Sequence, residues 1–112
     1  MTRLPMLGSA AEMERLAASQ RPLLVTFTGP KCMICKRLAP MLEIVLEEAG
    51  ESIASGKVDA EALPDVAERF DIRSLPTTLL FRDGELADRL HGFATAGALR
   101  NWLRKNGVGA PN

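Results

Sequence analysis

Two cysteines are the residues of this chain that could most readily do chemistry. Both lie in the segment GPKCMICKRLAP, residues 29–40 of 112, and they are three positions apart. Cys32 and Cys35 are flanked by Lys31, Lys36 and Arg37. Thiols at this spacing can form a structural disulfide, supply half of a metal site, or exchange electrons with other disulfides. Which of these applies depends on the elements that position the pair.

The cysteine pair is expected at the start of a helix. The short apolar run PLLVTFTG, residues 22–29, predicts a buried strand directly before it. After it, apolar residues recur at spacings of three and four and predict a helix (Leu38, Met41, Leu42, Val45 and Leu46). A helix amino terminus and nearby lysines stabilise a thiolate, which brings a cysteine from a pKa near 8.5 to about 3.5–7.5. Cys32 is therefore the expected nucleophile, and Cys35 lies one helical turn later.

Three other chemistries stay open from these residues alone. A structural zinc ion usually takes four ligands, whereas the chain offers two cysteines and His91 at the end of a predicted strand. An iron–sulfur cluster shared between two chains would supply four thiolates. An inert disulfide is the third alternative, although a chain of this length does not need one in order to fold.

The remaining elements predict an α/β sheet. Helices are expected at residues 9–19, where Ser9 and Glu12 form a capping box, and at 63–70 and 95–105. Strands are expected at residues 56–60, 77–81 and 85–90. Asp83-Gly84 predicts a tight hairpin between the last two strands. The order of elements favours a sheet that is parallel at first and ends in an antiparallel pair, with helices on both faces.

Composition and charge argue against two classes of protein, those that bind nucleic acids and those that span a membrane. The chain has 14 basic and 14 acidic residues, and this balance argues against nucleic acid as a main partner. No apolar run is long enough to cross a membrane, and the first 14 residues lack the core of a signal peptide. We therefore expect a monomeric single domain, residues 1–112, in the cytoplasm, with an exported mature form left open. The charge is uneven, with six basic and two acidic residues in positions 1–42.

From about residue 20 to 106 the chain resembles the thioredoxin family. The residues that carry the resemblance are the strand with Cys-x-x-Cys-Lys, Pro40 in the following helix, the segment DIRSLPTTLLF at 71–81, Gly84 in the hairpin turn and Gly92. A lone pair of cysteines would be weak evidence, whereas the pair together with the downstream proline segment is specific. The resemblance implies a thioredoxin-like three-layer α/β/α sandwich with a mixed central sheet.

The resemblance also implies a substrate site. Pro76 is expected to follow a cis peptide bond and to face the cysteines. The backbone of Leu75 would then pair with an extended substrate, in a short form of strand addition. Gly92 and Phe93 would border the same apolar groove.

Several residues depart from the family pattern. The usual motif is Trp-Cys-Gly-Pro-Cys, whereas this chain has Lys31 before the first cysteine and Met-Ile between the two. Thr26 occupies the position of a buried aspartate that accepts a proton from the second cysteine, and a threonine cannot act as a base near neutral pH. Lys57 matches the lysine that usually accompanies that aspartate. It is expected to turn to Asp59 or Glu61, or to stay near Cys35 and tune it.

Two functions follow from these residues. The first is a thiol–disulfide oxidoreductase that exchanges electrons with protein disulfides through Cys32 and Cys35, in electron transport and cell redox homeostasis. It would need no cofactor other than its redox-active disulfide, no metal, and a separate reductase or oxidant to recycle it. The alternative is an adaptor module on the same fold, which would hold a client in the groove with little or no turnover.

Overall fold

A computed structural model describes residues 3–108 of the chain. Its strands are β1 (Leu23–Thr28), β2 (Ala54–Asp59), β3 (Thr77–Arg82) and β4 (Glu85–His91). Its helices are α1 (Ala10–Ala17), α2 (Met33–Ala49), α3 (Pro64–Arg69) and α4 (Ala96–Lys105), and a short 3-10 turn, η1 (Gly50–Ser52), follows α2. The order of helices and strands is the one that the sequence predicts.

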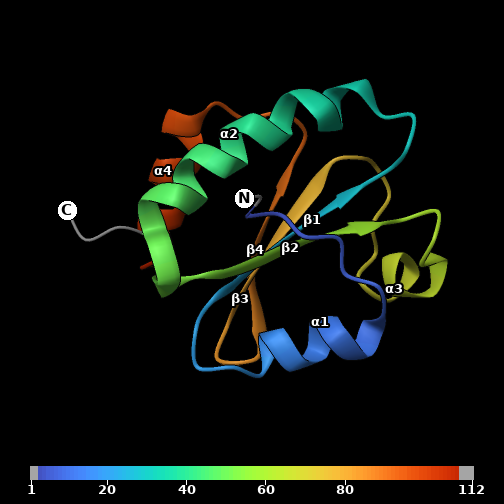
Figure 1. Ribbon diagram of the computed structural model, residues 1–112, viewed down its shortest axis with the longest axis horizontal. Helices are drawn as coiled ribbons and strands as arrows, with labels where there is room; N and C mark the ends of the chain where they lie inside the picture. Colours follow the sequence, from blue (N-terminus) through green and yellow to red (C-terminus); the bar gives the residue numbers. More distant parts are fainter. Residues whose placement is uncertain (1–2, 109–112) are drawn as a thin grey trace.

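The sheet is mixed, as expected. Its strand order is β2-β1-β3-β4, with β1 parallel to β2 and antiparallel to β3, and β3 antiparallel to β4. Because β1 and β2 run in the same direction, both carboxyl ends lie at one edge of the sheet. The segment that begins α2 leaves from that edge, so the sheet determines where the cysteines lie (Figure 1).

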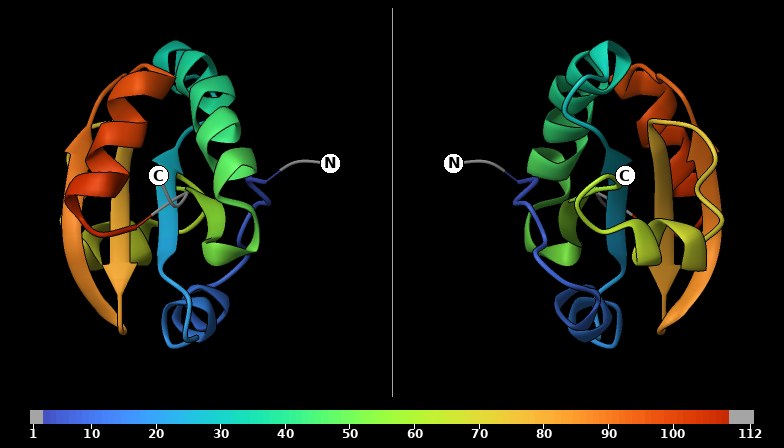
Figure 2. Two further views of the ribbon diagram at one scale, coloured as in Figure 1. Left: turned by 90° about the vertical axis from the view of Figure 1, so that its left-hand side faces the viewer. Right: turned by 90° about the vertical axis from the view of Figure 1, so that its right-hand side faces the viewer.

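Helices cover both faces of the sheet and form two hydrophobic cores (Figure 2). Leu24 and Leu80 pack with the residues of α2 and α4. Their neighbours along the strands, among them Val25 and Leu79, pack with α1 and α3 on the opposite face. This alternation follows from the two-residue period of a strand and gives the three-layer α/β/α sandwich. Within the described residues no helix has the length and hydropathy needed to cross a bilayer.

The segment before α1 lies along the outer edge of β2, which the sequence did not indicate. Met6 forms an isolated parallel bridge with Lys57. The Leu7 amide donates to the Lys57 carbonyl at 2.8 Å, and the Lys57 amide donates to the Pro5 carbonyl at 2.9 Å. A sheet edge with unpaired backbone groups is thereby partly covered.

The predicted cap of α1 and the predicted hairpin turn are both present. The hydroxyl of Ser9 accepts from the Glu12 amide at 3.1 Å, while the Glu12 carboxylate accepts from the Gly8 amide at 2.8 Å, one residue earlier than an ideal capping box. The hairpin turn has positive φ at both central positions, 55° at Asp83 and 80° at Gly84. That backbone twist suits a two-residue hairpin.

Candidate active site

Cys32 and Cys35 lie at the amino terminus of α2, where the sequence places them. Cys32 is the N-cap residue, and its sulfur accepts a hydrogen bond from the Cys35 amide at 3.2 Å. The two residues are joined by a disulfide, with Cα atoms 5.3 Å apart. Cys32 is partly exposed and Cys35 is 7% exposed. The outer sulfur can therefore meet a partner, whereas the inner one is screened by the protein.

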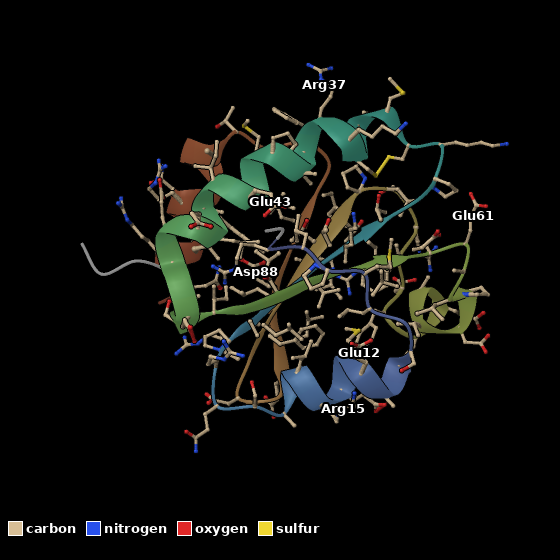
Figure 3. All side chains as sticks on the ribbon, in the orientation of Figure 1. Glu12, Arg15, Arg37, Glu43, Glu61 and Asp88 are labelled. Carbon is tan, nitrogen blue, oxygen red and sulfur yellow. A yellow bond between two sulfur atoms is a disulfide. The ribbon has the colours of Figure 1, made fainter. Side chains whose placement is uncertain are left out.

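Exposed cations surround the outer cysteine. Lys31, Lys36 and Arg37 are all exposed. The Arg37 guanidinium carbon lies 5.7 Å from the centroid of the Phe93 ring, a cation–π distance. Figure 3 shows Arg37 projecting from α2, whereas Arg15 lies on α1 at the opposite end of the molecule. The amino terminus of α2 adds its own partial positive charge at the same place.

The predicted groove residues converge on this end of the molecule. The Leu75–Pro76 peptide bond is cis. A Cβ atom at Gly29 would lie only 3.0 Å from Leu75 Cδ1, so Leu75 packs closely against the chain that leads into the cysteine motif. The Gly92 amide donates to the Pro76 carbonyl at 2.9 Å, which brings Gly92 and Phe93 beside the same segment.

The Leu75 backbone is available for pairing. Within residues 3–108, neither its amide nor its carbonyl takes part in a backbone–backbone hydrogen bond or a strand pairing. Strand β3 begins only at Thr77. An extended peptide could thus hydrogen-bond to Leu75 without displacing a neighbour in the described chain.

A small cavity of about 110 Å³ lies behind the inner cysteine. Polar groups from three elements reach it: Thr26 and Thr28 from β1, Lys57 from β2, and Cys35 and Lys36 from α2. Leu4 and three apolar residues of α2 complete the lining. Two threonines and two lysines therefore line the cavity beside Cys35, and no acidic residue is among its lining residues.

Thr26 is buried in this wall, 5% exposed, where the resemblance places a carboxylate. Its hydroxyl accepts a hydrogen bond from the Thr78 hydroxyl at 3.1 Å. Thr26 pairs in register with Lys57 on the parallel strand β2. The predicted juxtaposition of Thr26, Lys57 and Cys35 is present in the geometry.

Lys57 lines the cavity beside Cys35 and forms no ion pair among the described residues. Among the described residues, no carboxylate lies within ion-pair distance of its amine. The Asp59 carboxylate instead accepts from the Glu61 and Ala62 amides at 2.8 and 3.2 Å. Lys57 and Cys35 line the same cavity, and the tuning of Cys35 by Lys57 stays a prediction.

Sequence reasoning missed three contributors to the site. Thr28 could have been found, because it lies two positions after Thr26 on the same face of a strand. Leu4 and the contact of Arg37 with Phe93 have no local signal, since each depends on how distant segments pack.

His91, the only histidine, lies near Thr77, with Nδ1 3.4 Å from the Thr77 hydroxyl. In the described part of the chain, no group of three histidine, cysteine or carboxylate side chains is arranged to hold a metal ion.

Comparisons with known proteins agree with this geometry. "Thioredoxin Y2, chloroplastic" of Arabidopsis thaliana is 39% identical over 84 residues, which are 75% of this chain and 50% of that protein. A thioredoxin-like protein of Synechocystis is 37% identical over 91 residues, which are 81% of this chain and 87% of that protein. This chain spans about half the length of the Arabidopsis relative.

Solved structures and the family comparison give the same answer. A Plasmodium falciparum thioredoxin superposes with a TM-score of 0.82 at 28% identity, covering 91% of this chain and 98% of that chain. For a mutant thioredoxin of Halobacterium salinarum the TM-score is 0.85 at 24% identity, covering 97% and 96%, a likeness of fold. The sequence model of the family described as Thioredoxin matches residues 7–105. The chain therefore belongs to the thioredoxin family.

Proposed function

We propose that this protein is a thiol–disulfide oxidoreductase that acts on protein disulfides through Cys32 and Cys35. The observation that carries the proposal is the asymmetry of the pair: one sulfur is partly exposed at a helix N-cap, and the other is buried against a polar cavity. A nucleophile needs access and a stabilised thiolate, whereas its resolving partner needs protection from solvent and from competing thiols.

The first step is attack by the outer sulfur. In the reduced protein, the Cys32 thiolate attacks one sulfur of a substrate disulfide, a Cys32–substrate bond forms, and the other substrate sulfur leaves as a thiolate. The helix terminus and the Cys35 amide stabilise the Cys32 thiolate. The substrate backbone pairs with Leu75 beside Pro76, and Phe93 and Gly92 border the chain on the far side.

The second step is attack by the inner sulfur. Cys35 passes its proton to water or to the substrate thiolate released in the first step, and its thiolate attacks Cys32. The Cys32–substrate bond breaks, the second substrate sulfur leaves as a thiolate, and the disulfide forms in the protein. Two electrons have then passed from the protein to the substrate, and a separate reductase or oxidant must reset the pair. We propose that Lys57 supports this step by stabilising the Cys35 thiolate electrostatically, because Thr26 cannot accept the proton.

The proposal also covers the cofactor, the oligomeric state, the substrates and the location of the protein. The redox centre is the cysteine pair itself, with no added cofactor. The protein acts as a monomer on disulfide-bearing proteins. A cytoplasmic location is proposed from the sequence. Three of the relatives carry "chloroplastic" in their names, so the family also occurs in another compartment.

Reduction of insulin by dithiothreitol tests the function. The wild-type protein should accelerate the precipitation of reduced insulin chains, and Cys32→Ser should abolish the acceleration. Cys35→Ser should instead accumulate a mixed disulfide through Cys32, visible by mass spectrometry. An Arg15→Gln variant, altered at an exposed position on α1, serves as the matched control. If wild type and Cys32→Ser give the same rate, the enzyme proposal fails and the adaptor function takes its place.

A further inference from the structure

The cations beside Cys32 are unbalanced. Between Glu14 and Glu43 the chain has no acidic residue, whereas it has five basic ones (Arg15, Arg21, Lys31, Lys36 and Arg37). Three of the five gather at the start of α2, whose first turn contains no acidic side chain. In the described part of the chain, Lys31, Lys36 and Arg37 form neither an ion pair nor a side-chain hydrogen bond.

Other arginines of the molecule are used internally, which sets these three apart. Arg3 donates to carbonyls at the end of α2, Arg69 pairs with Glu14 at 3.3 Å, and Arg100 pairs with Glu48 at 2.8 Å. Lys31, Lys36 and Arg37 are instead exposed and have no such partner among the described residues. Their positive charges can therefore interact with a molecule that approaches Cys32.

The apolar surface next to these cations is exposed as well. Met33 is 68% exposed, Ile34 is 47% exposed and Phe93 is 44% exposed. Arg37 lies over the Phe93 ring, which places its guanidinium at the border of the groove. Apolar area supplies contact with a bound segment, and the cations beside it select the charge of that segment.

Two carboxylates lie at the end of β2 and on the segment that follows it. Asp59 ends β2 in register with Thr28, so it lies at the sheet edge from which the cysteine motif leaves. Glu61 follows on the loop to α3, apart from Arg37 in Figure 3. The cations at the start of α2 form no ion pair within the described residues, so acidic residues of a bound segment should face α2.

We propose that the preferred substrates are disulfides in extended segments with acidic side chains next to the cysteine, which lie against Lys31, Lys36 and Arg37. This inference rests on the proposed function and adds the substrate class to it. The exchange itself is unchanged: the protein dithiol becomes a disulfide, the substrate disulfide becomes two thiols, and two electrons move. The cations select among substrates through encounter and orientation, whereas their effect on the Cys32 thiolate is the same for every substrate.

Three synthetic substrates test the proposal. Each is a symmetric disulfide dimer of a short peptide with one cysteine, flanked by aspartates, by lysines or by serines. Fully reduced protein is mixed with each peptide, the reaction is quenched with acid, and the released peptide thiol is measured by chromatography. At low ionic strength the acidic peptide should react about tenfold faster than the basic one, with the serine peptide between them. Added salt should reduce the ratio towards one, because it screens exposed charges.

Variants assign the preference to the three cations. Combined Lys31→Gln, Lys36→Gln and Arg37→Gln substitutions should remove most of the ratio, and Arg37→Glu alone should lower it. Arg15→Gln, which removes one positive charge far from the site, should leave it unchanged. The ratio is the readout because a change in Cys32 reactivity affects all peptides equally.

Each outcome decides one question. Equal rates for the three peptides with wild type would overturn the substrate class while leaving the oxidoreductase function intact. A preference that survives in the triple variant would overturn the role of these residues. If none of the peptides, including the serine peptide, is reduced by the wild-type dithiol, then the proposed function itself fails.

Discussion

At the scale of single residues, the site separates one reactive thiol from one protected thiol. Cys32 is the N-cap of α2 and accepts the Cys35 amide, whereas Cys35 faces a cavity that contains hydroxyls and an amine. The two sulfurs therefore differ in environment although they are only three positions apart. This difference leads to two predictions.

The pKa of the Cys32 thiol in the reduced protein should lie below that of free cysteine, about 8.5, because the helix terminus and neighbouring cations stabilise its thiolate. Thiolate absorbance against pH in a Cys35→Ala variant, which isolates Cys32, measures it. The triple variant at Lys31, Lys36 and Arg37 should raise this pKa towards the free value. A value for Cys32 at or above that of free cysteine would contradict the electrostatic account of the nucleophile.

Thr26→Asp should accelerate the second step of the reaction by at least about tenfold and leave the first nearly unchanged, because a carboxylate can accept the Cys35 proton. Rapid-quench mass spectrometry, which counts mixed disulfide against released thiol, resolves the two steps. The same change should lower the free energy of unfolding by about 1–3 kcal/mol, since it buries a carboxyl group, unless Lys57 pairs with it. Thr26→Asn is the control of similar shape without a base. No gain over Thr26→Asn would mean that Thr26 serves only in packing.

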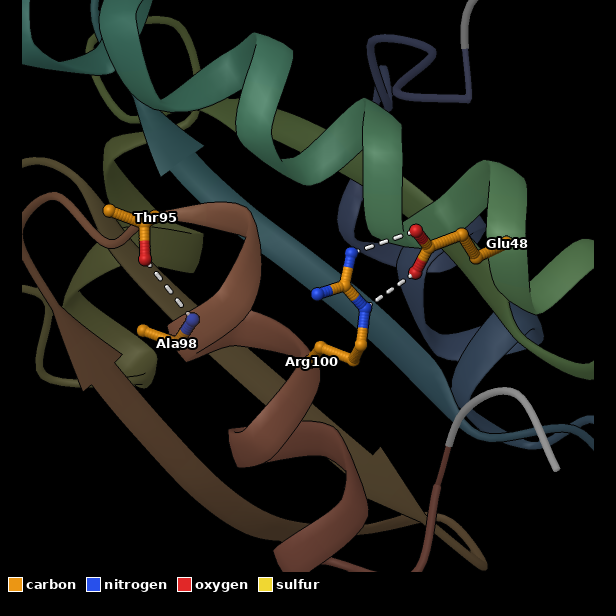
Figure 4. Close-up of polar contacts among 4 residues, drawn as sticks. All are labelled: Glu48, Thr95, Ala98 and Arg100. Carbon is orange, nitrogen blue, oxygen red and sulfur yellow. Dashed lines mark hydrogen bonds and ion pairs between the residues drawn. The ribbon is translucent and has the colours of Figure 1, made fainter. Parts of the chain in front are cut away.

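At the scale of elements, the last helix is capped at its amino end and is joined to α2 and to the sheet by polar contacts of its later residues. Its N-cap Thr95 accepts from the Ala98 amide at 3.1 Å, and Arg100 donates two hydrogen bonds, both 2.8 Å, to the Glu48 carboxylate of α2 (Figure 4). Near its carboxyl end, the Asp88 carboxylate of β4 accepts from Trp102 Nε1 at 2.9 Å and from Asn106 Nδ2 at 3.0 Å. These contacts hold α4 against both α2 and the sheet.

Asp88 should make stability depend on pH in the acid range. The hydrogen bond from Asn106 is the largest influence and lowers the pKa of the Asp88 carboxyl, burial opposes it, and the Arg89 amide and Trp102 lower it further. A lowered folded pKa contributes stability above the unfolded value of about 3.9, and that stability is lost as pH falls through the folded pKa. Asp88→Asn should therefore cost about 1–2 kcal/mol at pH 7 and flatten the dependence below pH 5.

Urea unfolding followed by circular dichroism between pH 2 and 7 measures this dependence. Glu85→Gln, on an exposed position of the same strand, is the matched control. An Asp88→Asn variant with an unchanged acid profile would show that the carboxylate charge contributes nothing to the link between β4 and α4.

The elements were predictable where local pattern and local chemistry agree. Short runs of strand-forming residues predicted the strands, helical periodicity predicted the long helices, and Ser9, Thr95 and the Asp83-Gly84 turn predicted some of their ends. The edge segment before α1 was not predictable, because its bridge to β2 depends on a partner some 50 positions away. In the site, the cysteines and Pro76 follow from a motif, whereas the contact of Arg37 with Phe93 arises only when α2 and the loop after β4 pack together.

At the scale of the whole molecule, Arg3 joins segments that are far apart in the sequence. Its guanidinium donates to the carbonyls of Leu46 at 2.6 Å, Gly50 at 2.8 Å and Ile53 at 3.1 Å. Its own amide donates to the Glu43 carboxylate at 2.7 Å, and its carbonyl accepts from the Ser55 hydroxyl. One side chain thus binds carbonyls at the end of α2 and just before β2, and the Leu46 carbonyl also accepts from the Gly50 amide.

Replacing Arg3 with Met should lower the free energy of unfolding by about 1–3 kcal/mol, because up to three hydrogen bonds to carbonyls are lost while the aliphatic length is kept. Chemical denaturation against wild type and Arg15→Gln measures the difference. Peptide reduction should remain unchanged, because Arg3 contacts the end of α2 that lies opposite the cysteines. A loss of activity with intact stability would mean instead that the edge segment shapes the cavity behind Cys35 through its neighbour Leu4.

Trp102 gives the molecule a built-in spectroscopic probe. It is the only tryptophan in a chain without tyrosine, so near-ultraviolet emission comes from one indole. That indole is 8% exposed and donates to Asp88, between α4 and the sheet. Its emission maximum and quantum yield will therefore report the docking of a single helix, without any label, and will shift as the Asp88 carboxyl gains its proton.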